Sequence, residues 1–529
     1  MKQTDKNLHE KLWSSAQQLR ANSSLKLNEI SEPILGLIFL KFAEVRFKRS
    51  KQEIEDEKSL IIRDSSSTRL RPLSPDDFKA KGILYVPEKA TYGFLMSLPE
   101  NENIGKAINE AMAEIEEYNK DLAGVLPQNY TSLVKNANEN NELLLTLLKS
   151  FNQIPDDIEG DAFGGIYEYF LGQFAIAEGQ NGGEFFTAQS IVKLMVEVIE
   201  PYQGRIYDPA CGSGGMFVQS ANFVAKHKEY GAQVMDKITI YGQEKTSSTV
   251  NIAKMNLAIH GLSGKIVQAN SYYENPFDSN SKFDFVLANP PFNVSGIDKN
   301  KQIVIDPAKI QGDARFSYGL PVTQKGDITN ANYLWVQLFA NSLSENGRAG
   351  FVMANSAGDA NHAEKEIRKK LIENNLVDVM VAVGSNMFLN VILSCTLWFF
   401  DKGKKNTNRK DKVLFINAQD IFTPVDRAHN TWTKEQIQQI ADIVRRYRGE
   451  KGYEKYEDIA GLSKIATIDE IEANDYSLNP GRYIEVKEKP ADDIDFEKRM
   501  KELMNEFTTL TDEAHGLESK IIKDWEEII

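Results

Sequence analysis

The stretch RIYDPACGSGGMF, residues 205–217, decides the fold, because its pattern is that of a short buried strand followed by a glycine-rich turn and a helix. The strand is predicted over 205–207 and the helix over 215–228. Three glycines in four positions allow backbone conformations that a Cβ would forbid, and the start of a helix offers free N–H groups. The turn lacks the Gly-Lys-Ser/Thr of a P-loop and the full G-x-G-x-x-G spacing, which disfavours ATP and NAD as ligands.

Strands alternate with amphipathic helices on both sides of this turn. Further strands are predicted over 238–242, 265–269, 283–288, 349–354, 377–383 and 394–400, and further helices over 247–260, 332–346 and 363–374. This alternation predicts an α/β fold with a doubly wound, mostly parallel, Rossmann-like sheet of seven strands. Ligands of such sheets bind at the carboxyl ends of the strands, where the residues that carry chemistry are therefore expected.

The chain of 529 residues is longer than one hydrophobic core usually organises. Apolar residues at helical spacing predict an all-α N-terminal domain over 1–150, followed by the catalytic sheet domain over 160–417 and a mixed extension over 418–487. The C-terminal tail, 488–529, is predicted to be a helix with a heptad seam, either packed on its own chain or used for contact with another subunit. The seam positions are Phe496, Met500, Leu503, Phe507, Leu510, Ala514, Leu517 and Ile521.

A rigid polar and aromatic array, Asn289-Pro290-Pro291-Phe292, follows the strand over 283–288. Two prolines stop the strand and fix the backbone. The Asn289 amide and the Pro290 carbonyl can then accept the two N–H hydrogens of a planar amino or amide nitrogen while Phe292 stacks on the flat group. The sequence therefore predicts binding of a planar amino-bearing group at this strand end.

Three other segments are predicted to lie near the glycine-rich turn. Glu244, at the end of the second strand, can accept both hydroxyls of a ribose. Asn270, after the third strand, can reach the edge of an adenine. The loop GGEFFTAQ, residues 182–189, can fold over the pocket, with Thr187 as the N-cap of the next helix.

Composition and charge limit the cellular setting and the mode of action. The chain has 62 basic and 76 acidic residues, a net charge of −14, which argues against tight autonomous nucleic-acid binding. Its two cysteines, Cys211 and Cys395, cannot form a disulfide framework and favour a reducing compartment. No apolar run approaches the roughly 18 residues that span a bilayer, and the start of the chain lacks an apolar signal core. We therefore expect a cytoplasmic location and no membrane partner.

Taken together, residues 1–487 resemble the modification (methyltransferase) subunit of type I restriction-modification systems. This family comprises S-adenosyl-L-methionine-dependent, adenine-N6-specific DNA methyltransferases. The resemblance is carried, in chain order, by LWSSAQQLR, PILGLIFLKF, GGEFFTAQ, DPACGSGGMF, YGQE with KMNLAIHG, NPPF, NYLWVQLF and SLNPGRYI.

The resemblance implies a role for each motif. The cofactor-binding residues would be Glu184, Phe185, Phe186, Thr187, Ala188, Gln189, Asp208, Gly212, Ser213, Gly214, Gly215, Glu244 and Asn270. Asn289, Pro290, Pro291 and Phe292 would be the catalytic residues, because they would hold an adenine flipped out of the duplex. Two positions depart from the family pattern: Ala188 stands where proline is usual, and Asn270 where many relatives have Asp. No metal is required by this chemistry.

The resemblance also implies partners: DNA, a specificity subunit that reads the sequence, a second copy of the modification subunit, and a restriction subunit in some complexes. The loop over 293–329 contains Lys299, Lys301, Lys309, Arg315 and Lys325, which are expected either to contact phosphates or to be solvated. Two alternatives stay open at this point. The Asn-Pro-Pro-aromatic motif also serves methylation of a protein glutamine amide or an RNA guanine amino group, and a scaffold could bind the cofactor without turnover.

Overall fold

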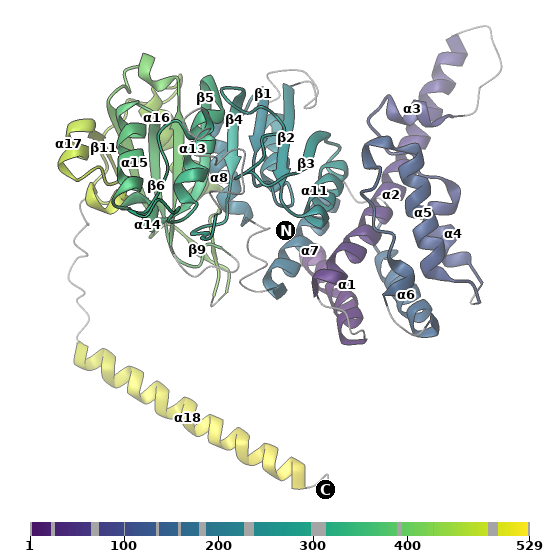
Figure 1. Ribbon diagram of the computed structural model, residues 1–529. Coiled ribbons are helices and arrows are strands. Elements are labelled where there is room, and N and C mark those ends of the chain that lie inside the picture. The colour runs from purple at the N-terminus through teal and green to yellow at the C-terminus, as the bar shows by residue number, and fades with distance from the viewer. Residues whose placement is uncertain are drawn as a thin grey trace. The chain divides into compact units, whose positions relative to one another are not determined.

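The computed structural model describes residues 3–22, 27–64, 73–99, 101–133, 137–156, 160–178, 187–226, 237–297, 314–388, 394–426, 428–484 and 496–526. The chain forms two compact units, Met1–Ile484 and Glu485–Ile529. Figure 1 labels the elements of both. Within the described residues, no helix is long and apolar enough to cross a membrane.

The N-terminal region of the first unit is helical, as the apolar spacing predicts. Its α-helices are α1 (Gln3–Asn22), α2 (Leu27–Asp64), α3 (Pro75–Lys79), α4 (Tyr92–Ser97), α5 (Ile104–Tyr118), α6 (Ala137–Phe151) and α7 (Gly160–Glu178). Their apolar faces share one core in which Ile34, Ile38, Ile108 and Phe170 are buried. Burial of these amphipathic faces, more than local helix propensity, stabilises such helices.

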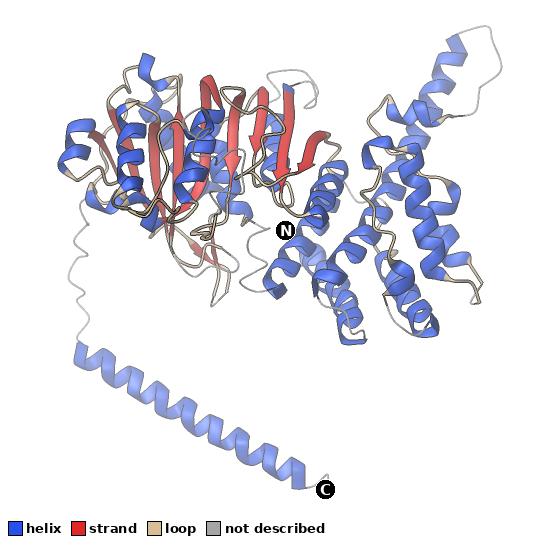
Figure 2. Ribbon diagram, viewed as in Figure 1, coloured by secondary structure: helices blue, strands red, loops and turns tan. Residues whose placement is uncertain are grey.

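A nine-stranded sheet forms the rest of the first unit (Figure 2). Its strands are β1 (Gly204–Asp208), β2 (Ile238–Glu244), β3 (Gly264–Gln268), β4 (Phe283–Ala288), β5 (Leu343–Ala354), β6 (Val377–Val383), β7 (Cys395–Asp401), β8 (Lys412–Ala418) and β11 (Ser463–Thr467). The spatial order is β11-β8-β6-β7-β5-β4-β1-β2-β3, in which β7 and β11 run antiparallel to their neighbours. The predicted doubly wound, mostly parallel fold is confirmed, and β8 and β11 extend the sheet beyond the seven predicted strands.

The strand order reverses direction between β1 and β4. From β1 the chain continues outward to β2 and β3, whereas β4 pairs with the other side of β1 and leads to β5. Crevices in open α/β sheets form at the carboxyl ends of the strands at such a switch point. The fold therefore places the segments after Asp208 and after Ala288 beside one another.

Helices cover both faces of the sheet. One face packs against α8 (Gln189–Ile199), α9 (Gly215–Lys226), α11 (Ser247–Ile259) and α16 (Lys434–Arg448), and the other against α13 (Asn332–Ser342), α15 (Ala363–Glu373) and α17 (Ile468–Ala473). Alternate residues of β1 serve the two cores, Ile206 the first and Tyr207 the second, as the strand period requires.

Helix α11 belongs to two cores at once. Val250, Ala253 and Leu257 pack into the sheet core, whereas Met255 and Ile259 pack into the core of the N-terminal helices. The helical region is therefore joined to the sheet through α11.

The helix predicted over 332–346 is shorter than expected. It ends at Ser342, and Leu343 already pairs with Phe283 at the start of β5. At Gly347 an added Cβ would lie 2.9 Å from the Phe283 carbonyl oxygen, so the chain passes here too close to β4 for a helix to continue.

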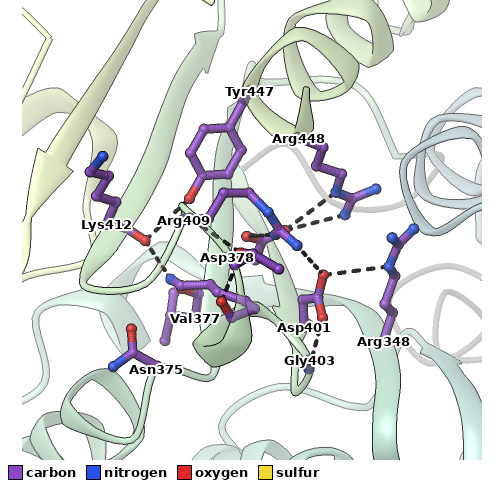
Figure 3. Close-up of polar contacts among 12 residues, drawn as sticks. Arg348, Asn375, Val377, Asp378, Asp401, Gly403, Arg409, Lys412, Tyr447 and Arg448 are labelled. Atoms are coloured by element: carbon purple, nitrogen blue, oxygen red, sulfur yellow. Dashed lines mark hydrogen bonds and ion pairs between the residues drawn. The ribbon is translucent and has the colours of Figure 1, made fainter. Parts of the chain in front are cut away.

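A network of buried ion pairs lies at the amino ends of β6 and β8, the sheet edge opposite the switch-point crevice (Figure 3). Asp378 pairs with Arg409 and, at 3.3 Å, with Arg448 of α16, and Arg409 also pairs with Asp401 at 2.8 Å. Burial opposes ionisation of Asp378, but the guanidinium groups of Arg409 and Arg448 outweigh it and hold the pKa of Asp378 below its ordinary value. The network joins α16 to the sheet.

The second unit contains one long helix, α18 (Phe496–Glu526). Large apolar side chains on it are exposed, among them Met500, Leu503, Phe507, Leu510, Leu517 and Ile521 of the predicted seam. The helix is present as predicted, and its apolar positions are not covered by the chain's own described residues.

Candidate active site

The turn between β1 and α9 takes the conformation that its glycines permit. Gly212 and Gly214 have φ values of 51° and 79°, in the left-handed region that residues with a Cβ rarely adopt. The Gly214 N–H donates to the Cys211 carbonyl at 2.8 Å, and helix α9 begins at Gly215. The glycines therefore bring backbone that carries no side chain to the carboxyl end of β1.

Asp208, the last residue of β1, is almost completely buried beside this turn. Its Oδ1 accepts the Ala210 N–H at 2.9 Å. Burial raises the pKa of Asp208 well above its ordinary range, and the nearby Glu244 carboxylate raises it further. Ionisation of the buried Asp208 carboxyl group therefore costs free energy. A ligand group that donates a hydrogen bond or carries positive charge would offset that cost.

Glu244, the last residue of β2, reaches across to the turn. Its Oε2 accepts the Gly212 N–H at 3.2 Å, and its Oε1 accepts the N–H groups of Lys245 at 2.8 Å and Thr246 at 3.2 Å. The ends of β1 and β2, which we expected at one edge of the sheet, are thus in direct contact.

Asn289 follows β4 and projects toward the same turn. Its Nδ2 donates to the Thr187 hydroxyl at 3.1 Å. Its Oδ1 is buried and has no hydrogen-bond partner among the described residues, although buried acceptors in native proteins are nearly always satisfied. Pro290 is buried, and Phe292 packs partly buried against the sheet core. A hydrogen-bond donor on a ligand would satisfy the Asn289 Oδ1 acceptor.

Asp208, Asn289 and part of the glycine-rich turn line one pocket at the switch point, whereas Glu244, Pro290 and Phe292 do not line it. Its walls are Thr187, Val192, Asp208, Ala210, Cys211, Gly212, Ser213, Gly215, Met216 and Asn289. A second pocket shares Thr187, Val192, Ser213 and Gly215 with the first and extends to Glu168 of α7. The structure therefore brings residues from three predicted site segments into these pockets, and Glu244, from a fourth, contacts Gly212 of the turn.

The other predicted site residues have different surroundings. Glu184, Phe185 and Phe186 lie outside the described residues. Gln189 donates through its side-chain amide to Glu168. The Oδ1 of Asn270 accepts the Tyr272 N–H at 3.2 Å, a local turn contact after β3. Gly214 lies in the turn but does not line the pocket.

Two expectations from the sequence were wrong in detail. Ala188, not Thr187, is the N-cap residue of α8, because the Thr187 hydroxyl accepts from Asn289 instead of from the helix. Arg315 is not available for a phosphate, since it is 2% exposed and donates to the carbonyls of Ser271 at 3.4 Å and Glu274 at 3.1 Å. Lys325 is exposed, whereas Lys299, Lys301 and Lys309 lie outside the described residues.

Sequence reasoning missed a polar chain that joins the first three strand ends. The Tyr207 hydroxyl donates to Gln243, whose amide donates to Ser271 Oγ at 3.2 Å, and the Ser271 hydroxyl donates to the Pro209 carbonyl at 2.5 Å. Each of these residues lies in the last two positions of a strand or just after a strand, and this position was the only feature of the sequence that could have indicated the contact.

Comparison with known proteins settles the family. The N-6 DNA methylase family model matches residues 158–492, and the model of the HsdM N-terminal domain matches residues 8–151. The chain belongs to the N-6 DNA methylase family.

Its relatives are methylase subunits of type I restriction enzymes. The MjaIX methylase subunit of Methanocaldococcus jannaschii is 38% identical over 96% of this chain and 89% of that protein. The HindI methylase subunit of Haemophilus influenzae is 36% identical over 80% of this chain and 92% of that protein. The crystal structure of a type I methyltransferase subunit from Streptococcus thermophilus has a TM-score of 0.71 at 24% identity and covers 91% of this chain and 100% of that chain, which shows the same fold.

The methylase subunit therefore transfers a methyl group from S-adenosyl-L-methionine to N6 of adenine in DNA, as part of a type I restriction-modification system. A solved structure from a study of type I restriction-modification complex assembly has a TM-score of 0.57 at 18% identity and shows the same fold. The comparisons support this activity and not methylation of a glutamine amide or of RNA. The residues of the site fit the cofactor, because the pocket combines the Asp208 carboxyl group with a glycine-rich turn, and Glu244 contacts that turn.

Proposed function

We propose that Asn289, Pro290, Pro291 and Phe292 bind the adenine that receives the methyl group. The observation that carries the proposal is the buried Asn289 Oδ1, which has no hydrogen-bond partner in the described part of the chain and lies in the pocket beside the glycine-rich turn. The oxygen would accept one N6 hydrogen, and the Pro290 carbonyl would accept the other. Phe292 would stack on the base, which must leave the duplex at a cost of roughly a few kcal/mol.

The cofactor is proposed to lie along the ends of β1 and β2. Glu244 would accept the ribose hydroxyls. Ser213, Gly214 and Gly215 would contact the methionine part, with Asp208 and Gly212 beside them and Asn270 toward the adenine of the cofactor. Residues 184–189 would cover the methionine part. When bound, the cofactor supplies an electrophilic sulfonium methyl group.

The protein contributes to catalysis by positioning the adenine and by electrostatic interactions with its amino group. Asn289 Oδ1 and the Pro290 carbonyl draw the N6 hydrogens away from the ring plane, which frees the nitrogen lone pair for in-line attack. The Thr187 hydroxyl oxygen accepts from Asn289 Nδ2 and anchors that end of the amide. The orientation of the amide then leaves Oδ1, and not Nδ2, for the base.

The test is methyl transfer by the full complex reconstituted with its specificity subunit. Tritiated methyl groups are counted in DNA digests that separate N6-methyladenine from other products. Asn289→Ala should abolish N6-methyladenine while the affinity for S-adenosylhomocysteine stays within about twofold, and Asn101→Ala, an exposed asparagine in an N-terminal turn, should behave as wild type. Near-normal methylation by Asn289→Ala would refute the assignment.

We further propose that the seam of α18 contacts the specificity subunit or the second modification subunit. Support comes from the exposed apolar positions, since large apolar side chains in a row usually mark an interface. Deletion of residues 492–529 should impair assembly and leave cofactor binding intact. Phe507→Asp should do the same, whereas Thr509→Asp, about 200° around the helix, should assemble normally. Unchanged assembly of both the truncated chain and Phe507→Asp would contradict the role.

The remaining expectations are also proposals. A cytoplasmic location is supported by the two buried thiols, Cys211 and Cys395, which a reducing compartment preserves. The division into domains at 1–150, 160–417, 418–487 and 488–529 is proposed as it stands. The net charge of −14 supports weak DNA binding by the isolated chain.

A further inference from the structure

A carboxylate on α7, Glu168, faces the second pocket and forms no ion pair with any described residue. Glu168 lines this pocket together with Ser213 and Gly215 of the glycine-rich turn. It lies 40 residues before β1 ends, in a helix for which the sequence motifs predict no role in the site.

Two glutamine amides hold the carboxylate in place. Gln189, the first residue of α8, donates to Oε2, and Gln219 of α9 donates to Oε1 at 3.4 Å. Among the described residues Glu168 forms no ion pair: Lys193 of α8 acts on it only through space and bonds instead to the Gln189 side-chain oxygen at 3.4 Å. Neutral amides orient a carboxylate but do not neutralise its charge.

Ionisation of Glu168 is therefore costly in the free protein. Burial raises the pKa of Glu168 to about 6, although Lys193, Gln219 and Gln189 each act to lower it. Among the described residues, the charged group that acts on this carboxylate is Lys193 of α8. Burial and Lys226 of α9 lower the pKa of Lys193 itself. A cationic ligand group in the pocket would recover the cost, because it would pair with the ionised carboxylate.

The cofactor carries one such group at its amino-acid end, beside the part that Ser213 and Gly215 are proposed to contact. We propose that Glu168 binds the α-ammonium group of S-adenosyl-L-methionine, with Gln189 and Gln219 as positioning residues. The inference rests on the proposed placement of the cofactor in the neighbouring pocket. It adds an acidic residue from α7 to a site otherwise built from loops at the sheet edge.

The experiment is calorimetric titration of the full-length chain with two ligands. S-adenosylhomocysteine has the α-ammonium group, and 5′-methylthioadenosine lacks the whole amino-acid part. Glu168→Gln keeps the shape and should weaken S-adenosylhomocysteine binding about 10- to 100-fold, as expected for a buried charge-assisted hydrogen bond. Its affinity for 5′-methylthioadenosine should be unchanged. Glu345→Gln, an exposed acid at the opposite sheet edge, should bind both ligands as wild type does.

A pH series gives an independent readout. Between pH 5.5 and 7.5 the wild-type affinity for S-adenosylhomocysteine should rise about fourfold as Glu168 ionises in the free protein, and the rise should vanish in Glu168→Gln. Equal weakening of both ligands, or an unchanged affinity for S-adenosylhomocysteine, would overturn the role of Glu168. If the wild type bound neither ligand, the proposed cofactor site itself would fail, which separates the two outcomes.

Discussion

The side-chain nitrogen of Asn289 lies 3.1 Å from the hydroxyl oxygen of Thr187, and this contact joins segments 102 residues apart in the sequence. It anchors the Nδ2 end of the Asn289 amide, and Oδ1 then faces the pocket without a hydrogen-bond partner among the described residues. The segment before α8 therefore contacts the segment that follows β4.

Replacement of Thr187 by valine should lower kcat about 10- to 100-fold, since a loosely oriented acceptor reduces catalysis without loss of the group itself. Thr187→Ser keeps the hydroxyl and should retain most of the activity. The measurement is the steady-state rate of the reconstituted complex, with the affinity for S-adenosylhomocysteine as a check on the fold. Similar rates for the valine and serine variants would argue against orientation by Thr187.

Replacement of Glu244 by glutamine should weaken the binding of both S-adenosylhomocysteine and 5′-methylthioadenosine about 10- to 100-fold, because both carry the ribose. Glutamine keeps one side-chain oxygen, which can still accept the N–H groups of Lys245 and Thr246 at the start of α11, and it loses the acceptor for the Gly212 N–H. Calorimetry of both ligands provides the test, with Glu345→Gln as the matched control. Loss of one ligand only would exclude a ribose contact.

Replacement of Asp378 by asparagine should destabilise the sheet by about 3 kcal/mol, because it leaves Arg409 and Arg448 without their shared buried carboxylate. The folded pKa of Asp378 lies below its ordinary value of 3.8, so its contribution is present above that pH and is lost as pH falls through the folded pKa. Scanning calorimetry should show a lower melting temperature at pH 7 and a smaller difference from wild type below pH 4. Lys106→Ala, which breaks an exposed pair with Glu110, should change stability by less than about 1 kcal/mol.

Adjacent glycines of α7 should respond to alanine in opposite directions. A Cβ on Gly164 would lie 2.3 Å from Cε1 of His260 at the end of α11, so Gly164→Ala should destabilise by about 1–3 kcal/mol. A Cβ on Gly165 meets nothing within 4 Å, and Gly165→Ala should stabilise by about 0.5–1 kcal/mol through helix propensity. Thermal unfolding of the two variants side by side measures both effects. The same sign for both would mean that α7 does not approach α11 as closely as the structure has it.

The sheet could be predicted from sequence because its strands are short apolar runs between amphipathic helices. Strand β11, SKIAT, could not, since its pairing with β8 is specified by tertiary packing and not by a pattern in five residues. The C-terminal end of α13 was missed for a similar reason, because Leu343 is apolar at a position that suits either a helix or a strand.

The same distinction holds for the candidate site. Segments after Asp208, Glu244 and Ala288 were predictable as neighbours because parallel strands end at one edge. Glu168 was not, because an acid within a helix has no motif around it, and only the packing of α7 against α8 and α9 shows that it faces the pocket. The role of Thr187 was missed because a threonine before a helix usually caps it.

The buried ion pairs around Asp378 lie at the amino ends of the parallel strands, and the pocket beside Asp208 lies at their carboxyl ends. Substitutions that accumulate at one edge need not be compensated at the other, since sites that share no contacts have nearly additive effects. A substitution near Asp378 can therefore change the stability of the subunit, as predicted for Asp378→Asn, and leave the residues of the pocket unchanged. Separation of these two kinds of residue is thus a source of evolvability.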